Sequence, residues 1–348
     1  MAQGYDTSIY TFSFQYPNFL FPGTTQFSLE PAPVDLKIKV CINSINPLNW
    51  LIVGNELKNL KPDIIVIRYW LPFMGPCFGT ILRKIKKNKF TRIVCIADNI
   101  IPHEKRTGDV AFTKYFVKPV DAFIAMSKKV LKDISIFVKN KPMRFVPLPL
   151  YDNFGQSVSK EDARKKLGIR FEDKVLLFFG FIREYKGLDI LFEAMAIIKN
   201  SIPDLKLLVV GEYYGNRKKY EDLIDKLGIK DSLILHTQFI ADSEVKFYMC
   251  AADCVVQPYR HATQSAVTPV AYHFEKPMII TNVGGLPDLV ADKKAGLIAE
   301  PNADDLAKKI IEYFELGEQH FLSHIREEKK KYSWNSMVQA IIDLAAVK

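Results

Sequence analysis

The sequence predicts an α/β protein of two domains, each built on a parallel sheet covered by helices. Short, β-branched apolar runs alternate with longer helical patterns along the whole chain, which is typical of parallel sheets. The alternation occurs twice, and a segment with Pro147, Pro149 and Gly155 separates the two halves like a linker. A length of 348 residues suits two domains of ordinary size. We therefore predict two Rossmann-like domains, at 1–148 and 149–331.

Each expected element follows from its local pattern. The strands of the first domain are expected at Ser8–Ser13, Val40–Asn43, Ile64–Tyr69, Arg92–Asp98, Ala122–Ser127 and Arg144–Leu148, with helices such as Leu48–Leu60 and Phe73–Lys87 between them. The strands of the second domain are expected at Val175–Gly180, Lys206–Gly211, Leu233–Gln238, Cys254–Pro258, Met278–Thr281 and Gly296–Ala299. An amphipathic pattern predicts a final helix within 332–348, and periodicity leaves open whether it packs back on the N-terminal domain.

The start of the first domain departs from the expected scheme. A Rossmann-type sheet opens with a strand, a Gly-rich turn and a helix, whereas here Gly4-Tyr5-Asp6 leads directly into the first expected strand. We therefore expect this domain to lack its first strand–loop–helix unit, which would leave neighbouring strand edges without a partner. Either the natural chain begins upstream of the given sequence, or the protein is a shorter form with a modified sheet. We prefer the explanation that the sequence is shortened at its start.

Composition excludes several other classes of protein. No run of eighteen uncharged apolar residues is present, which argues against a membrane-spanning helix. The N-terminal residues lack the basic start and apolar stretch of a secretory signal. The five cysteines are scattered, odd in number and without zinc spacing, so we expect reduced core thiols in a cytoplasmic protein.

Basic residues are concentrated in the first half of the chain. Residues 1–150 hold 21 Lys and Arg against 10 Asp and Glu, and the remainder holds 27 against 29. The densest basic run, 83–89, lies at an expected helix end. A solvated helix C-terminus and peripheral docking on an anionic membrane both stay open for this run. Nucleic acid is not expected as a partner, because no aromatic-interleaved recognition motif accompanies the charge.

The stretch from Phe178 to Asp189 combines a strand end, two cations and a helix start. Gly180 ends the strand, and the loop that follows carries Arg183 and Lys186. Cations at the carboxyl end of a parallel strand face the crevice where ligands bind, and they can neutralise a departing diphosphate. As mere surface charges they would oppose the dipole of the helix that follows. We therefore predict that both cations bind a ligand.

This loop resembles the Gly-Arg-x3-Lys-Gly loop of the retaining glycosyltransferases of family 4, whose fold is called GT-B. The resemblance covers Val175 to about Phe314 well and the first domain more loosely. It implies a donor domain at 149–331, an acceptor-side domain at 1–148, and binding of the donor diphosphate by Arg183 and Lys186. In the family the arginine follows the glycine directly, where this chain has Phe181. Residues two apart in an extended loop point the same way, so Arg183 can take that role.

A second segment, Gln257–Ala266, runs from an expected strand into a helix start. It contains the small polar residues Thr263, Gln264 and Ser265. Backbone N–H groups at such a helix start bind anions, and an ordinary helix cap is the alternative. The resemblance implies a Glu-x7-Glu pair in this region, whose second member holds the nucleotide ribose, but the aligned positions are Ala262 and Val270. Altered ribose contacts and a loss of activity both stay open.

Two further segments match the family's nucleotide-binding loops. The paired glycines Gly284 and Gly285 precede a helix and let the backbone approach a ligand closely. They resemble the family's Val-Gly-Gly-Leu-Pro-Glu loop, while a pure turn is the alternative. Gly211 and Glu212 resemble the position at a strand end near the nucleotide.

In the first domain, the loop after the strand at 92–98 contains His103 and Glu104. A histidine at the carboxyl end of a strand is placed to contact a sugar or acceptor hydroxyl. By resemblance the corresponding loop supplies a histidine near the donor sugar, so we predict that role for His103. A surface helix-cap segment is the alternative. Two other histidines, His320 and His324, lie four apart among charged residues, and we expect a solvated face there rather than a metal site.

The predicted function is transfer of a sugar from a nucleotide-diphosphate sugar to a glycan or lipid-linked acceptor, with retention of configuration. The resemblance implies this reaction in the cytoplasm or at the inner membrane face. No Asp-x-Asp pattern occurs, so we expect no metal or other cofactor. A non-catalytic protein that binds nucleotide sugar or glycan is the alternative. A dinucleotide-dependent oxidoreductase is disfavoured, because the sequence contains no Gly-x-Gly-x-x-Gly segment.

Overall fold

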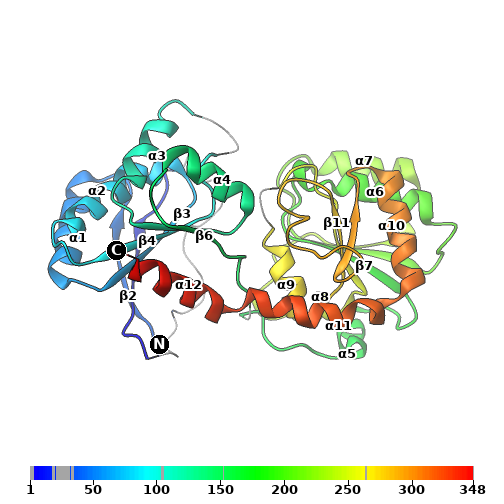
Figure 1. Ribbon diagram of the computed structural model, residues 1–348. Coiled ribbons are helices and arrows are strands. Elements are labelled where there is room, and N and C mark those ends of the chain that lie inside the picture. Colours follow the sequence, from blue (N-terminus) through cyan, green and yellow to red (C-terminus); the bar gives the residue numbers. More distant parts are fainter. Residues whose placement is uncertain are drawn as a thin grey trace. The chain divides into compact units, whose positions relative to one another are not determined.

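The computed structural model describes residues 4–17, 20, 32, 35–102, 106–151, 153–262 and 265–347. It divides into two compact units (Figure 1). Unit 1 consists of Met1–Ala125, Val130–Arg144 and Ala340–Lys348, and unit 2 of Met126–Lys129 and Phe145–Gln339. Each unit has its own hydrophobic core of buried side chains.

Unit 2 is built on one parallel sheet of six strands. Its strands are β7 (Lys174–Phe179), β8 (Leu205–Val210), β9 (Leu233–His236), β10 (Cys254–Gln257), β11 (Met278–Thr281) and β12 (Gly296–Ala299). The strand order is β12-β11-β10-β7-β8-β9, and every described pair is parallel. The chain therefore reverses its winding direction at β7 and β10, which is where ligands bind in open sheets of this kind.

The helices of unit 2 lie on both sides of this sheet (Figure 1). They are α5 (Lys160–Leu167), α6 (Leu188–Ile198), α7 (Arg217–Leu227), α8 (Asp242–Ala251), α9 (Val267–His273), α10 (Ala303–Leu316) and α11 (Glu318–Lys329). Helix α6 packs against α7 and α10, and α5 packs against α8. Because the strands are covered on both faces, their sequences are almost continuously apolar.

Unit 1 contains two sheets rather than one. Strands β1 (Ser8–Phe14) and β2 (Lys37–Asn43) form a parallel pair. A second sheet has the order β3-β4-β5-β6, with β3 (Ile64–Tyr69), β4 (Arg92–Ala97), β5 (Ala122–Ala125) and β6 (Met143–Phe145). Within the described residues β3 pairs only with β4, so its other edge has no strand partner. The expectation that the first domain lacks its opening unit stays a prediction.

The helices of unit 1 are α1 (Pro47–Leu60), α2 (Gly75–Lys86), α3 (Asp109–Val117) and α4 (Lys128–Phe137). The expected helix at Phe73–Lys87 is a short 3-10 turn followed by α2. The strands β5 and β6 are shorter than predicted. For β6 the reason is Pro147 and Pro149, which lack the N–H group needed to continue the ladder.

The last helix, α12 (Trp334–Ala346), begins in unit 2, and its final residues belong to unit 1. Arg144 Nη1 pairs with Asp343 Oδ2 at 2.9 Å, and Arg92 Nε donates to the carbonyl of Ala345 at 3.2 Å. Among the described residues, none of the helices has the length and apolarity that crossing a membrane requires.

All five cysteines are free thiols. Cys77, Cys95, Cys250 and Cys254 are buried, and burial raises the pKa of each of these thiols. A raised pKa keeps a thiol protonated and unreactive. The prediction of core thiols is therefore confirmed for these four, while Cys41 is half-buried.

Candidate functional site

Four predicted site segments meet at one edge of the unit 2 sheet. Strands β7, β8, β10 and β11 are parallel, so their carboxyl ends lie at the same edge. The loops that follow these strands contain Gly180, Gly211, Ser265 and Gly284. Thr263 and Gln264 lie outside the described residues, as does His103 of unit 1. Their predicted roles stay predictions.

The loop after β7 is fixed by backbone hydrogen bonds to the loop after β8. Gly180 N–H donates to the carbonyl of Val210 at 2.9 Å, and Ile182 N–H donates to the carbonyl of Glu212 at 2.8 Å. Gly211 has φ +136°, and a Cβ there would lie 2.4 Å from the carbonyl oxygen of Gly180. A side chain at position 211 would therefore force the two loops apart.

Lys186 is the most unusual group at this edge. It ends a 3-10 turn, Glu184–Lys186, and only 9% of the residue is exposed. Within the described residues its Nζ has no hydrogen-bond acceptor and no acidic partner. Burial, with a smaller contribution from Arg183, lowers the pKa of Lys186 to about 8. A buried ammonium is costly unless an anion compensates it, so this position favours an anionic ligand.

Gly180 makes room for this ammonium group. A Cβ at position 180 would lie 2.8 Å from Lys186 Nζ, and the residue has φ +97°. On another side of the ammonium lies the ring of Tyr259, whose centroid is 5.6 Å from Nζ. Position 180 therefore favours glycine for two reasons, because the backbone has a positive φ and because a side chain would collide with the ammonium of Lys186.

Arg183 lies exposed beside Lys186, in extended conformation with φ −125° and ψ 151°. Its guanidinium carbon is 4.7 Å from the centroid of the Tyr214 ring. The exposed ring of Phe181 contacts the same tyrosine, with centroids 4.6 Å apart. No acidic side chain among the described residues pairs with Arg183. Two cations without acidic partners thus lie in one short loop.

The loop after β10 brings a third cation to this edge, which the sequence analysis missed. Arg260 Nη2 pairs with Asp189 Oδ2 at 2.7 Å, and Arg260 N–H donates to the carbonyl of Tyr185 at 2.7 Å. The other carboxylate oxygen of Asp189 is buried and has no hydrogen-bond partner in the described part of the chain. A charged residue directly after a buried strand is the signal that could have revealed Arg260.

Ser265 makes local contacts just before helix α9, whose N-cap residue is Ala266. Its hydroxyl accepts a hydrogen bond from Val267 N–H at 3.1 Å and lies 3.4 Å from the hydroxyl of Tyr259. The residue is 4% exposed. The predicted role of Ser265 at the nucleotide stays a prediction. Val270, at the aligned position of the second family glutamate, is buried in α9.

The glycine pair after β11 joins the loop after β10. Gly284 has φ +55°, and a Cβ there would lie 1.6 Å from the carbonyl oxygen of Ala262. That oxygen accepts a hydrogen bond from Gly285 N–H at 3.1 Å. The two loops are therefore in direct backbone contact, which requires glycine at 284.

The geometry defines an α/β protein of the Rossmann-like class, with two cations that have no acidic partner in the described residues at the carboxyl edge of a parallel sheet. The family model described as glycosyl transferases group 1 matches residues 159–332, half of the chain. The chain belongs to this family.

Three relatives illustrate the likeness in sequence. A D-inositol 3-phosphate glycosyltransferase of Segniliparus rotundus is 33% identical over 40% of this chain and 32% of its own length. An uncharacterized glycosyltransferase of Methanocaldococcus jannaschii is 28% identical over 82% of this chain and 76% of its own length. The lipopolysaccharide glucosyltransferase WaaG of Escherichia coli is 28% identical over 53% of this chain and 50% of its own length. The alignments thus span from about a third to three quarters of these relatives.

Solved structures show the same fold. Anabaena HepE in complex with UDP has a TM-score of 0.72 at 16% identity, covering 88% of this chain and 85% of that chain. Sucrose-phosphate synthase from Thermosynechococcus elongatus has a TM-score of 0.70 at 17% identity, covering 99% and 89%. The predicted fold class, GT-B, is confirmed.

Proposed function

We propose that this chain transfers a sugar from a nucleotide-diphosphate sugar to a glycan or lipid-linked acceptor, with retention of configuration. The observation that carries the proposal is the buried ammonium of Lys186, which has no acidic partner among the described residues. Solved structures of HepE hold UDP and UDP-glucose, and this supports a nucleotide-sugar donor for the present chain.

The chemical role of the site is to stabilise the departing diphosphate. As the bond between the sugar and the diphosphate breaks, negative charge grows on the diphosphate while the sugar becomes oxocarbenium-like. Lys186 and Arg183 place positive charge where this negative charge develops, and such preorganised groups accelerate the reaction. In this proposal the cations take the place of a metal ion, and no cofactor is needed. Gly211, Glu212, Gly284 and Gly285 border the nucleotide.

The acceptor side of the proposal rests on the first domain. His103 contacts the donor sugar or an acceptor hydroxyl, as the resemblance implies. Peripheral contact with an anionic membrane is part of the proposal, because residues 1–150 are strongly basic. The apolar side chains of Leu48 and Ile52 on α1 are also largely exposed, and apolar groups beside basic ones favour a membrane interface.

A panel of UDP-, GDP- and ADP-sugars tests the proposal. We expect one nucleotide class to raise the melting temperature and its sugar to be slowly hydrolysed in the absence of acceptor. A thermal shift without any turnover, even with candidate acceptors, would indicate a protein that binds nucleotide sugar without catalysis. This is the alternative that Ala262 and Val270, in place of the family's two glutamates, leave open. If none of the nucleotides changes the melting temperature, the donor site is wrongly assigned.

Arg183→Ala should weaken donor binding without destabilising the fold. The guanidinium is exposed and makes no ion pair in the described residues, so we expect a change in unfolding free energy within about 0.5 kcal/mol. Loss of one charge-assisted contact to the diphosphate should raise the Kd about tenfold. Isothermal titration with the best nucleotide measures this change. Lys218→Ala on α7 removes an exposed cation of the same unit and should leave the Kd unchanged.

A further inference from the structure

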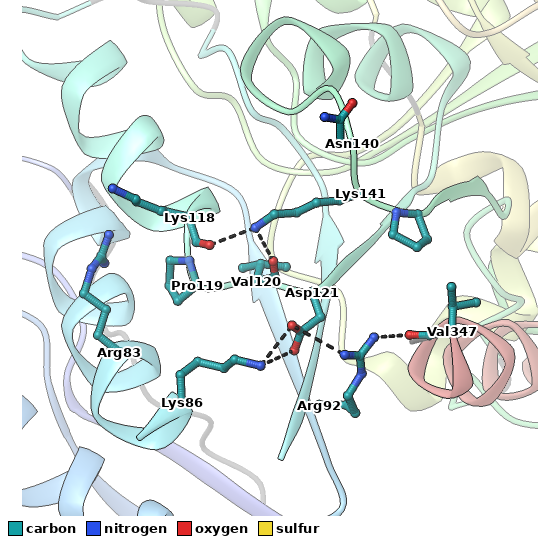
Figure 2. Close-up of a pocket in the computed structure, with 11 residues that line it drawn as sticks. Arg83, Lys86, Arg92, Lys118, Pro119, Val120, Asp121, Asn140, Lys141 and Val347 are labelled. Carbon is teal, nitrogen blue, oxygen red and sulfur yellow. Dashed lines mark hydrogen bonds and ion pairs between the residues drawn. The ribbon is translucent and has the colours of Figure 1, made fainter. Parts of the chain in front are cut away.

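Unit 1 contains a pocket at one edge of its four-stranded sheet (Figure 2). The pocket has a volume of about 510 Å³. It includes Arg92, the first residue of β4, Asp121 just before β5, and Pro142 just before β6. Strands β4 and β5 are parallel, so Arg92 and Asp121 lie at the amino ends of these strands, whereas the loop with His103 follows the carboxyl end of β4. The pocket thus lies at the other edge of this sheet from the start of the predicted acceptor loop.

The side chains around this pocket carry a large excess of positive charge. Among the described residues that line it, Asp121 is the only acidic one. The basic residues that line it are Arg83, Lys86, Arg92, Lys118 and Lys141. Figure 2 shows Lys86 and Arg92 directed toward Asp121 from two sides. Lys86 Nζ lies 2.9 Å from Asp121 Oδ1, and Arg92 Nη1 lies 3.8 Å from the same oxygen. A single carboxylate therefore compensates the charge of two cations only in part.

Two further cations are held by backbone carbonyl groups. Lys141 Nζ donates to the carbonyls of Val117 at 3.0 Å, Lys118 at 2.8 Å and Val120 at 2.5 Å. Arg83 donates to the carbonyls of Gly79 at 2.8 Å and Tyr115 at 2.6 Å. Carbonyl oxygens satisfy the hydrogen bonds but carry no net charge. These contacts fix the cations in place without neutralising them.

The remaining polar groups of the pocket are free to bind a ligand. Among the described residues, neither the ammonium of Lys118 nor the side-chain amide of Asn140 has a partner, and both side chains are exposed. Burial, reinforced by Lys86, lowers the pKa of Lys141 despite the opposing effect of Asp121. Positive charge held in place, together with free N–H donors, favours a multiply charged oxyanion over a neutral ligand.

We propose that this pocket binds a phosphate group. A phosphate oxyanion accepts several hydrogen bonds and carries close to two negative charges at neutral pH, which suits one free ammonium, one free amide and a surplus of fixed cations. The pocket has the size of sites that hold small organic ligands, so a phosphorylated metabolite fits within it. The headgroup of an anionic phospholipid presents the same chemistry, and the experiment separates these two sources.

The test uses the full chain with inorganic phosphate as the first probe, at constant ionic strength. Hydrogen exchange followed by mass spectrometry should show phosphate-dependent protection of segments 114–121 and 139–143. Lys118→Glu and Asn140→Asp each change an exposed side chain without a described partner, so both variants should fold. Each variant should raise the phosphate concentration needed for half of this protection about tenfold. Lys132→Glu reverses an exposed lysine of α4 outside the pocket and should change it less than about twofold.

Sedimentation with vesicles forms the second arm. Binding to phosphatidylglycerol vesicles and not to phosphatidylcholine vesicles, lost in Lys118→Glu and kept in Lys132→Glu, assigns the phosphate to a lipid headgroup. Protection by inorganic phosphate without such vesicle binding assigns it to a soluble compound. Lys186→Met should leave both responses intact, which separates this site from the donor site. The proposal is overturned if neither arm responds to Lys118→Glu and Asn140→Asp, or if Lys132→Glu has the same effect as these variants.

Discussion

Lys186→Met is expected to weaken binding of the donor nucleotide at least about a hundredfold at neutral pH, the loss that follows removal of one preorganised group from a charged site. Methionine keeps much of the length and apolar bulk of lysine but removes its charge. The buried ammonium has no acidic partner in the described residues, so a bound diphosphate would be its main source of compensation. Isothermal titration of both proteins with the best nucleotide of the donor panel measures the loss.

The same variant should remove a pH dependence of donor binding. The pKa of Lys186 is about 8, and in the proposed function the diphosphate binds the protonated form. Above this pH the free protein loses the proton, and the Kd should rise about tenfold per pH unit. The charge of the phosphate stays constant there, because its last pKa is about 6. Titrations between neutral and mildly alkaline pH should therefore show a slope in the original chain and none in Lys186→Met.

Stability should change in the opposite direction to binding. Burial lowers the pKa of Lys186 from 10.5 to about 8, so the folded state holds the charged form at a cost below that pH. As pH rises from about 8 to 10.5, the folded state loses this proton while the unfolded state keeps it, and the free energy of unfolding increases. At neutral pH, Lys186→Met should raise the free energy of unfolding by on the order of 2 kcal/mol. Weaker binding in a more stable protein excludes misfolding as the cause.

Lys218→Met is the matched control for this prediction. It removes an exposed lysine of α7 in the same unit, and both binding and stability should stay unchanged. An unchanged Kd in Lys186→Met would contradict a role of this ammonium in donor binding. A lower melting temperature of that variant would contradict the cost assigned to its burial.

Gly284→Ala is expected to lower the free energy of unfolding by about 3 kcal/mol and to impair donor binding. The left-handed backbone alone costs an alanine about 1 kcal/mol. The added methyl group would also lie 1.6 Å from the carbonyl oxygen of Ala262, so the two loops must separate and the bond from Gly285 N–H to that oxygen must break. Strain of this kind between backbone segments adds about 2 kcal/mol. Denaturant unfolding measures the change in stability.

Gly168→Ala separates the two causes. Gly168 also has a left-handed backbone, with φ +68°, but a Cβ there would have no neighbour within 4 Å. It should therefore cost only about 1 kcal/mol and leave donor binding unchanged. Equal effects of the two substitutions would show that the contact between Gly284 and Ala262 contributes nothing.

Most of the unit 2 sheet could be predicted from local patterns. The ends of β11 and β12 agree with the prediction, and the other strands differ from it by one or two residues at one or both ends. Their runs are buried on both faces, so the apolar pattern is continuous and its limits are sharp. Local patterns also predicted that Gly180, Arg183, Lys186 and Gly284 lie in loops, because each of them comes shortly after such a strand.

Other parts of the site could not be predicted, because they depend on contacts between distant residues. The pair of Arg260 with Asp189 joins positions 71 residues apart, and no local pattern predicts such a pairing. The same reason applies to unit 1. Which strands pair there depends on hydrogen bonds between separate segments, so the division into two sheets is visible only in the fold.

The sequence by itself determined the alternation of strands and helices, the cations of the loop after β7, and the glycines that border it. These features depend on periodicity, charge and backbone freedom, which belong to single residues and their near neighbours. Only the tertiary structure decided that Lys186 is buried without an acidic partner in the described residues, and that five basic side chains line one pocket with Asp121 in unit 1. The physical reason is that burial and charge compensation arise from groups that the chain brings together when it folds.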